Sequence, residues 1–137
     1  MKKKVAIWAI AIIFLAIAIY FSFYQKKYEG KEIFSNDFEI DETSFLIWDS
    51  GQKSSKDFSH EDIIKLKDLL RNANYKGLSY KKSNTGFKLR YEMTAKENDK
   101  NYIIEIYDNG VLQLFDFYNN YWYAIDKGFE EIIEFLR

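Results

Sequence analysis

Residues 87–125 read FKLRYEMTAKENDKNYIIEIYDNGVLQLFDFYNNYWYAI, and this stretch decides the fold. Apolar and polar side chains alternate along its first part, which is the period of a half-buried β-strand. The tripeptide Asp108-Asn109-Gly110 is a strong hairpin signal and predicts a type I′ turn. Turns are also expected at 96–99 and at 119–120. The stretch therefore predicts four consecutive antiparallel strands, over 87–94, 102–107, 111–117 and 121–125.

A helix is predicted on each side of these four strands. Before them, Ser59 is a suitable N-cap, and residues 60–73 carry apolar side chains at helical spacing. After them, Asp126 is expected to cap a final helix. The apolar residues of that helix recur at positions i, i+3, i+4 and i+7 and form one stripe, which consists of Phe129, Ile132, Ile133 and Leu136.

Two further strands are predicted upstream of the first helix. They cover 43–48 and 53–58, and residues 49–51 form the turn between them. The predicted order is thus ββαββββα. We expect an α+β fold in which a small twisted antiparallel sheet has two helices packed on one face, because that arrangement buries every apolar stripe.

The N-terminal part of the chain predicts a membrane anchor. Residues 5–24 form an uncharged run of twenty residues, eleven of which are Val, Ile, Leu or Phe. About 20 apolar residues suffice for a helix to cross a bilayer. We predict a transmembrane helix at 5–24, with a cytoplasmic tail at 1–4. A juxtamembrane linker at 25–38 and an extracytoplasmic α+β domain at 39–137 are expected to follow.

The residues that flank this segment indicate its orientation in the membrane and whether it is cleaved. Lysines are equally frequent near its two ends, but the short tail with Lys2, Lys3 and Lys4 resembles the n-region of a secretory signal. This favours a single-pass protein of the cell membrane with the N-terminus inside and the domain outside. Secretion after signal cleavage is the alternative, because Ala16-Ile17-Ala18 has a small-x-small form. A signal peptide turns polar before its cut, and this run does not.

Composition excludes several classes of function. All 21 acidic residues lie beyond residue 27, against 15 of the 20 basic ones, so residues 28–137 carry a net charge of −6. Nucleic acid is therefore not an expected partner, since its binding depends on neutralising phosphates. The abundance of Lys, Asn, Ile, Tyr and Phe and the absence of proline are typical of a low-GC bacterial source.

Candidate catalytic and metal-ligating residues are scarce. The chain has one histidine, His60, which is expected to be an exposed first-turn residue of its helix, and no cysteine, so no Cys-His pair or two-histidine metal set can be assembled. The six glycines are scattered and form no phosphate-binding loop. We therefore predict no catalytic residue, no metal site and no small-molecule cofactor. Carboxylates are the only plausible machinery for an enzyme, and no spacing singles out a pair.

An aromatic cluster near the last predicted hairpin is the best candidate for binding a partner. Tyr and Trp in a strand alternate between its faces, so both faces cannot be core unless each is covered. Exposed aromatic patches mark recognition surfaces. The candidate partner-binding residues are Tyr118, Asn119, Asn120, Tyr121, Trp122 and Tyr123.

In layout, the chain resembles the small, single-pass, extracytoplasmic proteins of low-GC Gram-positive bacteria. The sequence favours a non-catalytic, membrane-anchored binding or interaction module whose partner is another envelope protein. One alternative is an immunity-type or inhibitor protein that acts at the membrane, because an acidic surface suits a cationic target. A second alternative is a small carboxylate-dependent cell-wall hydrolase.

Overall fold

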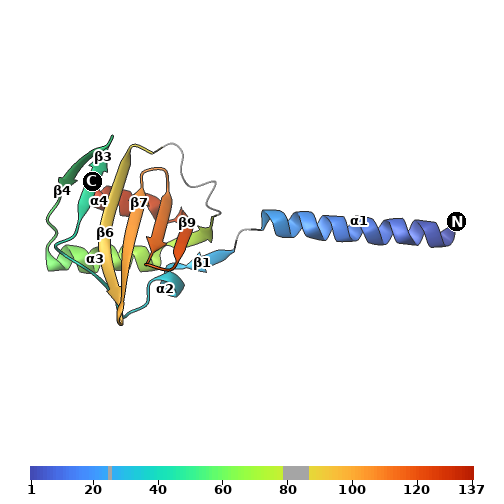
Figure 1. Cartoon of the computed structure of the whole chain (residues 1–137), viewed down its shortest axis with the longest axis horizontal. Coiled ribbons are helices and arrows are strands. Elements are labelled where there is room, and N and C mark those ends of the chain that lie inside the picture. The colour runs from blue at the N-terminus through green and yellow to red at the C-terminus, as the bar shows by residue number, and fades with distance from the viewer. Residues whose placement is uncertain (25, 79–86) are drawn as a thin grey trace.

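The computed structural model of the chain describes residues 1–24, 26–78 and 87–137. One long helix, α1 (Lys2–Phe23), extends away from an α+β domain (Figure 1). The elements of the domain are, in chain order, β1 (Lys27–Glu29), α2 (Gly30–Ile33), β2 (Phe38–Ile40), β3 (Leu46–Asp49), β4 (Gln52–Ser55), α3 (His60–Asn72), β5 (Asn74–Gly77), β6 (Leu89–Glu97), β7 (Lys100–Tyr107), β8 (Val111–Phe115), β9 (Asn120–Lys127) and α4 (Phe129–Leu136).

Helix α1 is long and apolar enough to cross a membrane. Residues Lys2–Ser22 have a mean hydropathy of 2.6, and none of the apolar window is buried against the rest of the chain. A core helix of a soluble domain would be covered by its neighbours, and α1 is not. A signal sequence near an N-terminus has the same length and composition.

The strands form one sheet in the order β1-β5-β9-β8-β7-β6-β3-β4, and β2 pairs with β6 beside β3. Every pairing is antiparallel. The four consecutive strands predicted from residues 87–125 are β6 to β9, and each pairs with the next along the chain (Figure 1). Sequential antiparallel pairing is the arrangement that short connections produce.

The two longer helices of the domain, α3 and α4, pack on the same face of this sheet, which we call the inner face. Their buried side chains share one cluster with alternate residues of the central strands. Figure 1 shows α3 and α4 together behind β6 and β7. The fully buried members include Leu66, Leu70, Met93, Ile104, Ile106, Leu112, Ile132 and Leu136. This arrangement confirms the predicted α+β class and the packing of two helices against an antiparallel sheet.

The structure corrects the predicted order of elements. It adds β1, α2 and β2 before β3, and it adds β5 where the end of the first helix was expected. The segment 25–38 therefore holds packed structure, although residue 25 itself lies outside the described residues. Phe34 is completely buried in the core. Strands of three or four residues are too short for alternation to reveal them.

One turn and one helix start also differ from the prediction. At the loop after β7, Gly110 has a φ of 86°, whereas Asp108 and Asn109 do not have a positive φ, so the turn is not type I′. A three-residue loop that ends in a left-handed glycine is the observed solution. Helix α4 begins after Gly128 rather than after Asp126. The Asp126 carboxylate instead lies 3.3 Å from Lys76 Nζ, across the β5–β9 pair.

Helix α2 is fixed against the C-terminal end of α3 by a close backbone approach at Gly30. The Gly30 N–H donates to the Ala73 carbonyl at 2.8 Å. A Cβ at residue 30 would lie 2.3 Å from the Leu70 carbonyl oxygen and 2.5 Å from that of Arg71. Only glycine therefore fits at this position without moving one helix away from the other.

We expect Gly30→Ala to lower the free energy of unfolding by about 1–3 kcal/mol, because the new methyl group must displace backbone atoms. Gly77→Ala is the matched control, since a Cβ there would meet its nearest atom at an ordinary 3.6 Å. Urea denaturation of the two variants measures the difference. Equal stability of the two variants would contradict the close approach.

Candidate functional site

The outer face of the sheet, opposite α3 and α4, carries the side chains of Arg90, Glu92 and Thr94. Strand register places these residues at the head of rows that cross the sheet. One row runs from Glu92 through Glu105 and Gln113 to Trp122, and the next from Thr94 through Ile103 and Phe115 to Asn120. The first row and the second row differ in character, and they form two adjoining surfaces.

The first surface is centred on Arg90, and we call it the Arg90 cluster: Trp48, Arg90, Glu92, Glu105, Tyr107 and Gln113. The guanidinium group lies 4.0 Å from the Glu92 carboxylate and 3.8 Å from that of Glu105. It also stacks 4.8 Å from the centroid of the Trp48 ring. The Trp48 indole N–H donates to Glu92 Oε2 at 3.2 Å.

The Arg90 cluster continues into a buried network. The Tyr107 hydroxyl donates to the Glu105 carboxylate and lies 3.2 Å from Gln113 Oε1. Gln113 in turn donates from Nε2 to Asn120 Oδ1 at 2.8 Å. Glu105 and Gln113 are each only 8% exposed. Burial, followed by the hydrogen bond to Glu105, raises the pKa of the Tyr107 hydroxyl, which therefore stays protonated at neutral pH.

Arg90 is needed because the register forces two acids together. Glu92 and Glu105 are direct cross-strand partners, and like charges in such positions repel. The cation beside both carboxylates converts that repulsion into attraction. Apart from Arg90 Nε, which is buried without a hydrogen-bond partner among the described residues, these polar groups contact one another, so the Arg90 cluster is a structural support for the outer face.

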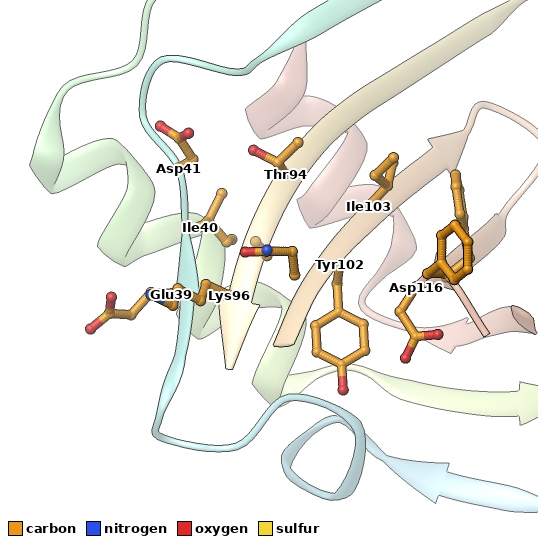
Figure 2. A pocket seen from close by; sticks show the side chains of 12 residues that line it. Glu39, Ile40, Asp41, Thr94, Lys96, Tyr102, Ile103 and Asp116 are labelled. Atoms are coloured by element: carbon orange, nitrogen blue, oxygen red, sulfur yellow. The ribbon is translucent and has the colours of Figure 1, made fainter. Parts of the chain in front are cut away.

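The second surface is an open groove of about 1000 Å³ on the outer face. Its floor follows the row that contains Thr94, Ile103 and Phe115. Figure 2 shows Asp41 and Asp116 on opposite sides of Thr94 and Ile103. Four charged side chains of the described residues line the groove, and they are Glu39, Asp41, Lys96 and Asp116. The groove thus combines an apolar floor with a net negative lining.

The β8–β9 loop forms one end of the groove. Asp116 Oδ1 accepts hydrogen bonds from the Tyr118 N–H at 2.7 Å and the Asn119 N–H at 2.6 Å. These two bonds lower the pKa of the Asp116 carboxyl, so it is ionised at neutral pH. The loop they fix presents Phe117 and Tyr118, which are 92% and 88% exposed. Of these two rings, Phe117 lines the groove.

The six sequence-predicted binding residues are divided between the two faces. Tyr118 and Asn119 lie exposed on the loop, and Asn120 is an exposed outer-face residue at the start of β9. Tyr121, 46% exposed, shares the inner-face parity of Tyr123. Trp122 and Tyr123 point to opposite faces as predicted, but both are buried, at 8% and 9% exposure.

Trp122 and Tyr123 are buried for different reasons. Tyr123 belongs to the main core, where its ring meets Tyr28 at 5.5 Å and Tyr75 at 6.1 Å. Burial raises the pKa of its hydroxyl to about 12. Trp122 stacks on Tyr107 at 6.2 Å and forms a small separate cluster with Tyr107 and Val111 on the outer face. Leu78 and Phe87, which are partly buried, pack against this cluster.

Sequence reasoning missed Ile103, Phe115, Asp116 and Phe117. Ile103 and Phe115 were treated only as parts of apolar strands. Neighbouring residues of a strand point to opposite faces, so both residues must lie on the outer face once Ile104 and Leu114 are assigned to the core. Asp116 and Phe117 were included in the predicted strand 111–117, whereas β8 ends at Phe115. The signal was the Asp-x-x-Asn spacing of 116–119, which favours an Asx turn.

Within the described residues, no group of three or more His, Asp or Glu side chains could hold a metal ion. His60 is exposed at the start of α3, and its Nδ1 lies 2.5 Å from Glu42 Oε1. No protein-family model, curated protein or solved structure matches this chain. The outer face therefore has to be interpreted from its own geometry.

We expect Arg90→Met to lower the free energy of unfolding by about 1–3 kcal/mol, because Glu92 and Glu105 lose the cation between them. Adding Glu105→Gln should recover part of that loss, since one of the two facing charges is then removed. Lys88→Met, at an exposed position just before β6, is the matched control and should change little. A double variant less stable than Arg90→Met alone would contradict this account of the cluster.

Proposed function

We propose that this chain is a membrane-anchored, non-catalytic binding module whose domain lies outside the cell and uses the outer-face groove to bind another envelope protein. The observation that carries the proposal is the exposure of Phe117, which is 92% exposed beside an apolar groove floor. Phe117 adjoins Ile103 and Phe115 of the groove floor, and a contiguous exposed apolar patch is typical of a contact surface.

The loop geometry supports recognition rather than chance exposure. Asp116 holds the loop through two backbone N–H groups, and the Phe117 and Tyr118 rings meet edge to face at 5.1 Å. A ring presented by a fixed loop loses little conformational entropy when it binds. Aromatic residues are also the side chains that most often dominate interface energies.

Helix α1 supports the membrane part of the proposal. Its apolar surface is uncovered by the domain, and about 20 such residues gain free energy by entering a bilayer. The short basic tail with Lys2, Lys3 and Lys4 favours the orientation with the N-terminus inside. The connection is short, because β1 begins only a few residues after α1 ends. A tethered domain of this kind acts close to the membrane surface.

An immunity-type or inhibitor protein is the second candidate, and the groove lining favours it. In the part of the chain that the structure describes, three acids and one lysine line the groove, and this lining suits a cationic target. A carboxylate-dependent hydrolase is less well supported. The Asp41 carboxylate accepts hydrogen bonds from the Thr43 N–H and hydroxyl, and Asp116 is bound in the same way by its own loop. These local hydrogen bonds lower the pKa of both carboxyls, so neither holds the proton that a general acid must donate at neutral pH.

A photoreactive phenylalanine analogue at position 117 should form a discrete adduct with another envelope protein when the full chain is irradiated in intact cells. The same analogue at Ile64, which is 49% exposed on α3, is the matched control and should form no such adduct. Mass spectrometry of the adducts identifies what was captured.

Three results would contradict the proposal. They are no adduct at position 117, equal capture at Ile64, or adducts only with lipid.

A further inference from the structure

We infer that the groove binds an extended peptide segment that carries two basic residues four positions apart with an apolar residue between them. This inference rests on the proposed function and specifies the chemistry of the partner. It follows from three features of the groove: acids at its two ends, an apolar floor, and the distance across the strands that separate the ends.

The acids stand at opposite ends of one row. Asp41 donates its backbone N–H to the Thr94 carbonyl at 2.9 Å, which places it on the β2 side of β6. Asp116 directly follows Phe115, the β8 member of the same row. Hydrogen bonds from local groups lower the pKa of both carboxyls, so both are ionised at neutral pH. Figure 2 shows the two acids separated by the groove floor.

The distance between the ends fixes the spacing of the basic residues. From Asp41 to Asp116 the row crosses three gaps between strands, which is about 14 Å at about 4.8 Å per gap. An extended chain rises about 3.3 Å per residue, so residues i and i+4 lie about 13 Å apart. Two basic side chains at that spacing can each reach one acid.

The floor between the acids requires an apolar residue. Ile103 and Phe115 are half-buried, and Phe117 stands exposed at the β8 end. In an extended peptide, residue i+2 points to the same side as residues i and i+4. The central side chain of the segment therefore meets the apolar floor while the basic residues on either side of it face the acids.

Charge distinguishes this occupant from the alternatives. Among the residues that the structure describes, Lys96 is the one cation that lines the groove, and it faces Glu39 across the β2–β6 pair. The remaining acids, Asp41 and Asp116, lie in a different row. A second copy of this chain would bring another domain of charge −6, and an anionic lipid surface would repel the same acids. A basic peptide segment complements them.

The test measures binding of short labelled peptides to the full chain in phosphatidylcholine nanodiscs by fluorescence anisotropy. The probe peptide is Gly-Ser-Lys-Ser-Leu-Ser-Lys-Ser-Gly. In two comparison peptides, the lysines become glutamates or the leucine becomes serine. Empty nanodiscs give the background from lipid. We expect the probe to bind, and both comparison peptides to bind at least about tenfold more weakly.

The variants assign the contacts. Asp41→Asn and Asp116→Asn keep the side-chain oxygen that holds each loop but remove the charge, and each should weaken binding up to about fivefold. Phe117→Ala should weaken it about tenfold. Glu134→Gln, which removes an exposed acid on α4, is the matched control and should leave binding unchanged. Raising the salt concentration should weaken binding to the wild type more than to Asp41→Asn.

No binding of the probe, equal binding of the glutamate peptide, or binding that the Asp41→Asn and Asp116→Asn variants do not change would overturn the inference. If the peptide test fails while position 117 still cross-links to an envelope protein, the groove binds a partner of different chemistry and the proposed function stands. If both fail, the proposed function fails as well.

Discussion

The packing of α3 and α4 on one face of the sheet is the constraint on which the rest of this structure depends. Side chains point alternately to the two faces along β6 to β9. Met93, Ile104 and Leu112 therefore lie on the inner face, where Leu66 of α3 and Ile132 of α4 pack in the same core. Among the described residues, no helix lies over the outer face of these strands (Figure 1). Its side chains must either satisfy one another or remain open to a partner, and the two surfaces described above are these two outcomes. The Arg90 cluster joins facing acids, aromatic rings and an amide into one network, while beside it Ile103 and Phe115 stay half-buried and Phe117 is exposed.

The two surfaces are adjacent because they occupy successive rows of one sheet. The Gln113–Asn120 hydrogen bond joins the network row to the groove row, so the network stiffens the strands that form the groove floor. Net contributions of about 1 kcal/mol per hydrogen bond are enough to hold local geometry. A fixed groove also limits the entropy lost on binding. The same physical logic applies to Asp116, whose hydrogen bonds fix the loop that presents Phe117.

Long periodic segments of this chain are predictable from sequence, and short ones are not. Alternation over β6 and the stripe in α4 predicted the class, the central strands and both longer helices. The elements β1, α2, β2 and β5 contain three or four residues each, which is too few for a period to be visible, so tertiary contacts such as the Gly30–Ala73 bond define them. The candidate site was predictable only in part. The aromatic cluster drew attention to the loop that borders the groove, but Trp122 is buried against Tyr107, a residue on another strand. The position of Asp41 opposite Asp116, at the other end of the groove, likewise depends on β2, which the sequence does not reveal.

Single-cysteine accessibility tests the central claim most directly, that the domain lies outside the cell with its outer face occupied by a partner. The chain has no cysteine of its own, so Asn101→Cys in the groove and Glu134→Cys on α4 each introduce one exposed thiol. In the purified full chain, a membrane-impermeant maleimide should label both thiols at similar rates. In intact cells we expect Glu134→Cys to label at the same rate and Asn101→Cys to be protected several-fold. Equal labelling of both in cells would contradict an occupied outer face, and labelling of neither before lysis would contradict an external domain.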